Sequence, residues 1–354
     1  MSTILVTGCS GLIGNTCVRY FHDKGYNIVG VDNDMRAYFF GKDASTATIT
    51  CELLNKYNNF DYRSVDIRNE SAISQIFQRY RNDIVAVIHT AAQPSHDWAA
   101  KEPMTDFSVN AVGTMVLLEE YRKHCPDAAF IFTSTNKVYG DTPNCLPLTE
   151  LPTRYEYIRD DNTLGAVSEN MSIDASKHSI FGASKVAADI MVQEYGRYFG
   201  LNTVCFRGGC LTGPSHQGAE LHGFLSYLLK CMVNGKHYTI FGYKGKQVRD
   251  NIHSYDLITM FDHYMANPRP GEVYNAGGGR NNSVSILEAI QIANDLGVDW
   301  DNYTISKQNR IGDHMWYISD LSKFKKHYPK WSQQHTIKGL ISDIIDIEKT
   351  KLES

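Results

Sequence analysis

Residues 3–14 read TILVTGCSGLIG, a short apolar run followed at once by three glycines at three-residue spacing. The run from Thr3 to Thr7 is rich in β-branched residues and predicts a strand, and a helical pattern continues from the glycines toward Gly25. Glycines permit a tight turn and let the backbone approach a pyrophosphate, whose charge then lies at the helix N-terminus. The order of strand, glycine turn and helix therefore predicts a dinucleotide-binding α/β fold.

A second predicted strand ends in an acidic residue at the spacing expected of a ribose-binding carboxylate. The apolar run Asn27 to Val31 is followed by Asp32, which lies 18 residues after Gly14. A carboxylate there accepts hydrogen bonds from a ribose diol and repels a 2′-phosphate, so we expect NAD rather than NADP. Arg36 follows four residues later and argues against that choice, although a solvated loop charge explains it equally well.

Strand and helix patterns continue to alternate along the chain. We expect strands at residues 62–65, 85–90, 129–134 and 202–206, and helices at 104–124, 181–199 and, in the tail, 335–347. The run from Val85 to Thr90 is almost continuously apolar, as in a strand buried on both faces of a parallel sheet. These patterns predict an α/β fold with a Rossmann-type, doubly wound parallel sheet that binds its ligand at the carboxyl ends of the strands.

The composition limits the classes of partner. A net charge of −4, a pI near 6.3 and dispersed Lys and Arg residues offer no basic surface, so no nucleic-acid partner is expected. The N-terminus lacks a basic and apolar leader, and no stretch approaches the roughly 18 apolar residues that span a bilayer. We therefore expect a soluble cytoplasmic protein without membrane contact. Eight cysteines without a C-x-x-C pair and 13 histidines without H-x-x-x-H spacing predict no metal site.

Residues 181–185, FGASK, resemble the Tyr-x-x-x-Lys signature of the short-chain dehydrogenases/reductases, with Phe181 at the tyrosine position. The G-x-x-G-x-x-G loop, residues 133–140 (TSTNKVYG) and residues 245–253 (GKQVRDNIH) are similar to motifs of the extended members of that family, in the same order. Within the family the chain most resembles NAD-dependent nucleotide-sugar epimerases of the CDP-paratose (CDP-tyvelose) 2-epimerase type. The resemblance covers nearly the whole chain and implies a Rossmann domain followed by a smaller, mixed α/β substrate domain.

The resemblance also implies which residues bind NAD. It assigns this role to the glycine loop, to the ends of the next two strands, to the loop after the fourth strand and to two helix residues: Gly8, Ser10, Gly11, Leu12, Ile13, Gly14, Asp32, Asn33, Arg36, Asp66, Ile67, Ala91, Ala92, Gln93, Asn110 and Lys185.

A nucleotide-diphosphate sugar, with CDP favoured, is the substrate that the resemblance implies. Its contacts are assigned to Gln93, Ser95, His96, Thr135, Asn136, Lys137, Arg249 and Arg310. The Thr135 hydroxyl can relay a proton between a sugar hydroxyl and a base, although a threonine at a strand end is also common for its β-propensity. The two arginines can clamp phosphate oxygens. Sugar-nucleotide dehydratases carry Asp-Glu after this threonine, so Asn136 and Lys137 argue against a dehydratase.

The expected domain organisation follows from the same resemblance. Residues 1–207 should form the NAD-binding domain and 208–354 the nucleotide-sugar domain, partly interleaved with the first. Residues 141–179 are polar, contain three prolines and show no clear periodicity, which predicts a long irregular insertion on the substrate side or a surface excursion. The family forms homodimers through the helices expected at 104–124 and 181–199, so we expect a homodimer here.

Phe181 is the one departure from the catalytic pattern of Thr135, Phe181 and Lys185, because a phenyl ring cannot exchange a proton. Three explanations remain: another base, an introduced replacement of tyrosine, or a protein with lost or altered catalysis. Candidates for another base are His96, Lys137 or a tyrosine of the insertion. Neutral imidazole accepts protons near physiological pH, which makes His96 the first candidate, although a lone histidine is often structural.

The sequence thus predicts an NAD-dependent nucleotide-sugar epimerase, acting at C2 through a transient keto-sugar. Lys185 should bind the nicotinamide ribose and lower the pKa of a neighbouring acid, unless it is only an exposed helix lysine. A non-catalytic NAD- or nucleotide-sugar-binding protein is the alternative that Phe181 leaves open, and a C4 epimerase of a UDP-sugar is a further one.

Overall fold

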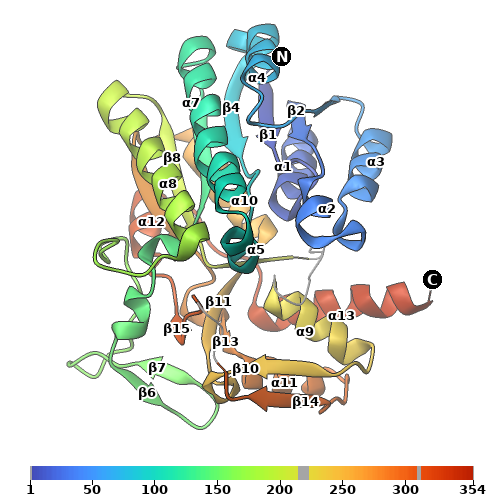
Figure 1. Cartoon of the computed structure of the whole chain (residues 1–354), viewed down its shortest axis with the longest axis vertical. Helices are drawn as coiled ribbons and strands as arrows, with labels where there is room; N and C mark the ends of the chain where they lie inside the picture. Colours follow the sequence, from blue (N-terminus) through green and yellow to red (C-terminus); the bar gives the residue numbers. More distant parts are fainter. Residues whose placement is uncertain (1, 214–222, 309–311, 354) are drawn as a thin grey trace. The chain divides into compact units, whose positions relative to one another are not determined.

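The computed structural model describes residues 2–213, 223–308 and 312–353 (Figure 1). The chain divides into two compact units, each built from three segments. Unit 1 comprises Met1–Val138, Ser179–Arg207 and Ile258–Tyr274, and unit 2 comprises Tyr139–His178, Gly208–Leu257 and Asn275–Ser354.

A seven-stranded sheet in the described chain organises unit 1, and its strand order is β12-β8-β5-β4-β1-β2-β3. The strands are β1 Thr3–Thr7, β2 Asn27–Asp32, β3 Phe60–Ser64, β4 Ile84–His89, β5 Ala129–Thr135, β8 Thr203–Gly208 and β12 Glu272–Ala276. β1 pairs in parallel with both β2 and β4, so the chain winds outward from β1 in both directions. This is the predicted doubly wound fold, and its switch point lies between β1 and β4, where such sheets bind ligands.

Helices connect these strands. They are α1 Leu12–Asp23, α2 Met35–Phe40, α3 Ala47–Lys56, α4 Glu70–Tyr80, α5 His96–Lys101, α6 Pro103–Phe107, α7 Gly113–His124, α8 Ser179–Phe199 and α10 Ser254–Ala266. The helix expected at 104–124 is interrupted, because a π-helical turn at Ser108–Val112 joins α6 to α7. Single π-turns inside α-helices occur frequently at functional sites, and this one contains the buried Asn110.

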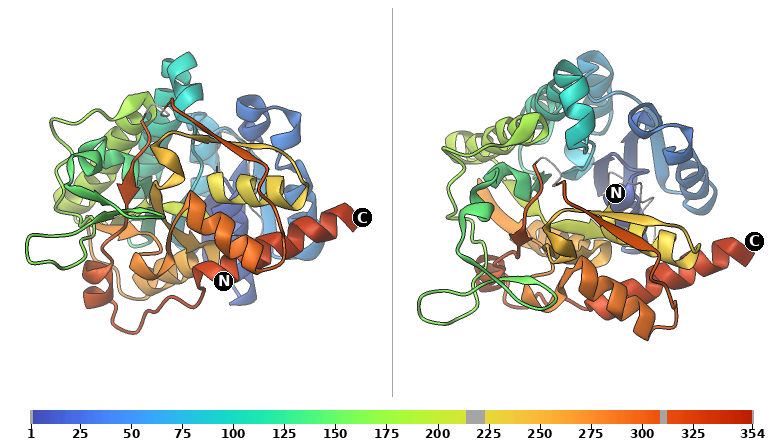
Figure 2. Two further views of the ribbon diagram at one scale, coloured as in Figure 1. Left: turned by 90° about the horizontal axis from the view of Figure 1, so that it is seen from below. Right: turned by 60° about the horizontal axis from the view of Figure 1, so that its bottom comes forward.

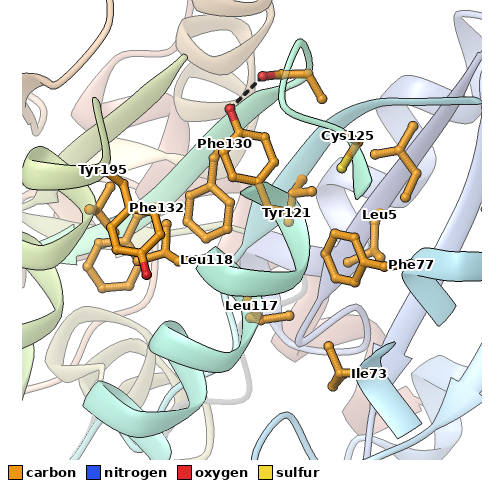
Figure 3. Close-up of a cluster of buried hydrophobic side chains, with 14 of the residues drawn as sticks. Leu5, Ile73, Phe77, Leu117, Leu118, Tyr121, Cys125, Phe130, Phe132 and Tyr195 are labelled. Atoms are coloured by element: carbon orange, nitrogen blue, oxygen red, sulfur yellow. Dashed lines mark hydrogen bonds between the residues drawn. The ribbon is translucent and has the colours of Figure 1, made fainter. Parts of the chain in front are cut away.

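One face of the sheet is covered by α4, α7 and α8, whose apolar residues form a core cluster with the strands (Figure 3). Alternate strand residues such as Leu5 and Phe130 meet Phe77 of α4 and Leu118 of α7 there. Each fully buried side chain of this size contributes about 1.5–3 kcal/mol relative to exposure. The Tyr121 hydroxyl is also buried, and it donates a hydrogen bond to the carbonyl oxygen of Ala128 at 2.8 Å.

The opposite face of the sheet carries α1 and α10. Phe206 of β8 packs against Phe261 of α10 with ring centroids 5.0 Å apart. The hydroxyl of Tyr20 of α1 donates a hydrogen bond to the carboxylate of Asp262 of α10 at 3.0 Å. Because helices cover both faces of the sheet, the ends of its strands are where polar side chains can meet a ligand.

The described residues of unit 2 contain three small sheets and, besides the start of α10, four α-helices. β10 Tyr238–Phe241 pairs in parallel with β14 Tyr303–Ser306, while β11 Val248–His253 pairs with β9 Cys210–Thr212, β13 Ser283–Ser285 and β15 Trp316–Tyr317. The helices α9 Phe224–Val233, α11 Ile286–Asp295 and α13 Ile337–Glu353 are drawn in yellow, orange and red in Figure 2, and their buried side chains share one apolar core. The helix predicted in the tail is α13. A further short helix, α12, spans Ser322–His327.

Residues 141–179 contain regular structure, so the prediction of an irregular insertion is wrong in part. β6 Leu148–Glu150 and β7 Tyr155–Tyr157 form an antiparallel hairpin. Glu156 of this hairpin is buried and accepts hydrogen bonds from Arg280 at 2.9 Å and from the indole N–H of Trp316 at 3.1 Å. These partners lie more than a hundred residues away in sequence, so the local pattern of residues 141–179 did not predict the hairpin.

Candidate active site

The glycine loop after β1 has a backbone that only glycine accommodates. Gly8 has φ of 67°, and a Cβ added to Gly14 would lie 2.0 Å from the carbonyl oxygen of Gly8. The loop closes where the amide of Gly11 donates to the Gly8 carbonyl oxygen at 3.0 Å. In the described chain α1 starts after Gly11 without a side-chain cap and has no acidic residue in its first turn. Its N-terminal N–H groups therefore suit an anion.

Asp32, at the carboxyl end of β2, is tied to this loop. One carboxylate oxygen accepts the amide of Ser10 at 3.0 Å, and the other accepts the amide of Asp34 at 2.9 Å. Burial raises the pKa of Asp32, and the two backbone donors oppose that shift. Each oxygen keeps a second lone pair, which is the acceptor set that a ribose diol requires.

Of the other residues predicted to contact the adenosine part of NAD, Asn33 and Arg36 follow β2, whereas Asp66 and Ile67 follow β3. Asn33 donates to Asp66 at 3.2 Å, and Asp66 forms an ion pair with Arg68 at 2.6 Å. Ile67 is buried against Gly113, where a Cβ would lie 2.6 Å from its side chain. Arg36 lies on α2 over the ring of Phe40, and burial lowers its pKa.

The loop after β4 runs from Ala91 and Ala92, both half-buried, to the start of α5. Asn110 pairs its side-chain amide with both backbone groups of Gln93, at 2.9 and 3.1 Å. The side-chain amide of Gln93 pairs in turn with both backbone groups of Ser95, at 2.5 and 2.8 Å. The Ser95 side chain caps α5, and this cap fixes the position at which the helix begins with His96.

Lys185 is buried on α8, next to the end of β5. Its ammonium group donates to the carbonyl oxygen of Thr133 at 2.9 Å and lies 4.2 Å from the ring centroid of Phe132. Burial lowers the pKa of Lys185 to about 8, although Asp189 one turn further along α8 favours the charged form. Lys185 is therefore no exposed helix lysine.

His96 and Phe181 are neighbours. The imidazole meets the phenyl ring edge to face with centroids 4.9 Å apart, and its Nδ1 lies 2.8 Å from the hydroxyl of Ser179. The same hydroxyl accepts the amide of Gly182 at 3.2 Å and so caps α8. Ser179 has φ of 62°, a strained backbone for a residue with a side chain, and such strain is often found at functional sites. An ionisable ring thus stands beside the ring that cannot exchange a proton.

Thr135 ends β5 and is half-buried. Its hydroxyl accepts the amide of Lys137 at 3.2 Å and lies 3.5 Å from the side-chain oxygen of Asn136, which is buried. The hydroxyl proton is thus only weakly engaged within this segment.

The predicted phosphate clamp belongs to unit 2. Arg249 of β11 is buried, donates to the carbonyl oxygen of Val248 at 2.8 Å and forms an ion pair with Asp313 at 2.6 Å. Its partner in the prediction, Arg310, lies outside the described residues. Within the residues that the structure describes, no group of three or more His, Cys, Asp or Glu side chains is placed to hold a metal ion.

Three polar residues near the site escaped the sequence analysis: Asp106, Ser179 and Asp189. A serine just before a helical run is a recognised N-cap signal, so Ser179 had a local signature. Asp106 and Asp189 lie four residues from Asn110 and Lys185, which puts each on the same helix face as its partner, but spacing alone does not distinguish them from surface carboxylates.

A model of the NAD dependent epimerase/dehydratase family matches residues 4–277 of the chain. The chain belongs to this family. CDP-paratose 2-epimerase of Salmonella typhi is 30% identical over 353 residues, covering 97% of this chain and 98% of that enzyme. dTDP-glucose 4,6-dehydratase of Escherichia coli is 27% identical over 362 residues, covering 97% and 92%. A solved structure of UDP-glucuronic acid 4-epimerase from Bacillus cereus, in complex with UDP-glucuronic acid and NAD, has a TM-score of 0.78 and 25% identity over 99% of both chains.

Membership confirms the predicted fold, family and NAD cofactor. The residues present fit NAD, because the Gly8–Gly14 turn excludes side chains where a pyrophosphate would approach and Asp32 keeps acceptor capacity for a ribose. This family contains both epimerases and dehydratases, so the reaction itself follows from the substrate side of the site. No helix in the described ranges is both long and apolar enough to cross a membrane.

Proposed function

We propose that the protein epimerises a nucleotide-activated sugar at C2, with a CDP-sugar as its substrate. The observation that carries the proposal is the 30% identity to a CDP-paratose 2-epimerase along nearly the full length of both chains. The neutral Asn136 and the cationic Lys137 supply no carboxylic acid next to Thr135, which disfavours the dehydratase reaction of other relatives. In this proposal unit 1 binds NAD and unit 2 binds the nucleotide sugar.

NAD, when bound, accepts a hydride from a sugar carbon and returns it to the opposite face of the resulting ketone. The chain's residues must then take the hydroxyl proton as the C–H bond breaks and give it back as that bond forms again. We assign this proton to His96, because its imidazole occupies the space beside Phe181 and is oriented by Ser179. With a proton on Nδ1 directed at the serine oxygen, Nε2 carries the lone pair that accepts. Thr135 donates or accepts along the path without storing charge.

Lys185 supplies positive charge close to the developing oxyanion and holds a cofactor ribose hydroxyl. Because burial lowers its pKa to about 8, the ammonium form dominates below that pH and is lost as pH rises through it. We expect kcat/KM to fall above about pH 8 in a pH–rate profile with saturating NAD. Lys185→Met should be slow throughout and lack this limb. A limb that persists unchanged in Lys185→Met would assign it to another group.

Hydride return can be tested directly in D2O. We expect a CDP-sugar to equilibrate with its C2 epimer in the presence of NAD without gaining deuterium at the inverted carbon, as followed by NMR and mass spectrometry. The carbon-bound hydrogen never exchanges with water in this mechanism, because it leaves and returns as hydride. Solvent deuterium at that carbon would instead indicate enolisation and exclude the proposed mechanism.

A C4 epimerase of a UDP-sugar is the second candidate, favoured by the full-length similarity to UDP-glucuronic acid 4-epimerase. A panel of CDP-, UDP-, GDP- and dTDP-sugars separates the two. If all are bound but none is turned over, either by this chain or by its Phe181→Tyr variant, the protein is a non-catalytic binder.

We further propose a homodimer formed through α6, α7 and α8. Two of these helices, α6 and α8, leave large apolar side chains exposed, namely Met104, Phe107, Ile190, Tyr198 and Phe199. Tyr198 is 80% exposed and Met104 82% exposed.

A further inference from the structure

Asp106 on α6 is a completely buried carboxylate to which the proposed chemistry gives no role. One of its oxygens accepts hydrogen bonds from the side-chain amide nitrogens of Gln93 at 2.7 Å and of Asn110 at 3.1 Å. Burying a carboxylate costs free energy unless hydrogen bonds compensate, so a group in this position needs a structural or functional reason.

The functional reason we infer for Asp106 is that an ionised carboxylate cannot donate a hydrogen bond. Burial raises the pKa of Asp106, while hydrogen bonds from Ser184 and Gln93 and the charge of Lys185 favour its ionised form. An ionised carboxylate only accepts hydrogen bonds, whereas the amides of Gln93 and Asn110 can each present either an oxygen or an NH2 group. Asp106 therefore selects one orientation for both amides, with the nitrogens facing it. The amide oxygens must then face the backbone N–H groups of Ser95 and Gln93, as observed at 2.5 and 2.9 Å.

These oriented amides connect to both sides of the His96–Phe181 contact. Gln93 holds the backbone of Ser95, the cap residue after which α5 begins at His96. Asn110 also donates to the hydroxyl of Ser184 at 3.0 Å, and that hydroxyl donates to the carbonyl oxygen of Phe181 at 2.9 Å. The π-helical turn places Asn110 between the two, so the start of α5 and the first turn of α8 share one buried anchor.

We propose that Asp106 is a positioning residue that fixes the Gln93 and Asn110 amides and thereby holds His96 against Phe181. The inference rests on the proposed role of His96 in proton transfer. Without an acceptor at position 106 the Gln93 amide can turn over, which presents NH2 to the Ser95 N–H and releases the start of α5. Asp106 touches neither the substrate nor the cofactor in this account and acts through its hydrogen-bond partners, which include Ser184 besides the two amides.

Two variants at this position separate hydrogen bonding from bulk. Asp106→Leu keeps a side chain of similar size but removes the acceptor, and it should lower kcat by about 100-fold, as expected for a small displacement of a catalytic group. Because Gln93 and Asn110 are also predicted NAD contacts, the dissociation constant for NAD is measured separately by calorimetry, and kcat is compared at saturating NAD. Asp106→Asn retains an acceptor oxygen and should keep most of the turnover. Thr105→Ala is the matched control, because Thr105 lies on the same turn of α6 and its side-chain hydroxyl donates to Glu102 rather than to the buried amides.

A double-mutant cycle tests whether Asp106 acts through His96. In a Phe181→Tyr background the proton is carried by a group on α8, so the loss caused by Asp106→Leu should shrink by at least about ten-fold relative to the parent. Equal losses in both backgrounds would show that Asp106 supports the fold in general, and the inference would fall.

A second readout does not depend on turnover. In protein labelled with 13C at the histidine Cε1 positions, the His96 signal, assigned by its disappearance in His96→Gln, should shift in Asp106→Leu and stay in place in Thr105→Ala. An unmoved His96 signal in Asp106→Leu overturns the inference. If no nucleotide sugar is turned over, the proposed function fails, while the NMR comparison still decides whether Asp106 positions the ring.

Discussion

His96→Gln is expected to lower kcat for epimerisation by about 100- to 10,000-fold, the range that positioned acid–base groups contribute. Glutamine retains a polar side chain of similar reach but cannot accept and return a proton at neutral pH. The ring of Phe181 cannot exchange a proton, and the imidazole beside it, with 4.9 Å between ring centroids, is an ionisable group in contact with it. The measurement is steady-state turnover of a CDP-sugar at saturating NAD, with NAD affinity checked separately and expected to remain unchanged.

His237→Gln is the matched control, because His237 is exposed and lies on unit 2, and its turnover should equal that of the parent. The combined His96→Gln/Phe181→Tyr variant should regain a large part of the lost activity, since tyrosine restores a proton-exchanging group at the position where the family carries one. Full activity in His96→Gln alone would transfer the role to Lys137 or to a tyrosine of residues 141–179.

Gly14→Ala is expected to abolish NAD binding. The added Cβ would lie 2.0 Å from the Gly8 carbonyl oxygen and 2.7 Å from Cα of Cys9, both backbone atoms that cannot yield without opening the turn. Opening the turn moves the N–H groups at the start of α1 away from the pyrophosphate that they would bind. Calorimetry with NAD measures the loss, and a melting curve of the variant without NAD checks that the sheet still folds.

Gly339→Ala provides the comparison for Gly14→Ala, because Gly339 lies within α13 and its Cβ would come no closer than 3.3 Å to the Thr336 hydroxyl. Alanine favours helices over glycine by about 1 kcal/mol, so this variant should bind NAD normally and melt no earlier than the parent. Normal NAD affinity in Gly14→Ala would mean that the cofactor does not use this turn.

The parts of the fold that are encoded locally were predictable. The glycine loop and the buried strand at 85–90 each carry their own signal within a few residues, and the observed elements match the predicted ones within one or two positions at most ends. The β6–β7 hairpin was missed because its anchor, Glu156, is paired with Arg280 and Trp316, which the sequence places far downstream. Long-range partners leave no periodic trace in the hairpin itself.

The candidate site was likewise predictable where its residues belong to local motifs and not where distant segments meet. Residue types such as Gly8, Asp32 and Lys185 could be selected from motifs, and their roles stay predictions. That His96 would meet Phe181 could not be selected this way, because 85 residues separate them and only the packing of α5 on α8 brings them together. The burial that lowers the pKa of Lys185 to about 8 is likewise a property of the folded core.

The π-helical turn at Ser108–Val112 makes this site sensitive to the deletion of a residue, a change that substitutions do not test. Such a turn holds one residue more than an ordinary helical turn, and losing that residue would rotate α6 against α7 by about 100°. A single-codon deletion there would leave a continuous, well-formed helix while swinging Asp106 away from Gln93. Length variation among related genes, rather than residue identity, is thus the evolutionary signal by which gain or loss of this arrangement would be recognised.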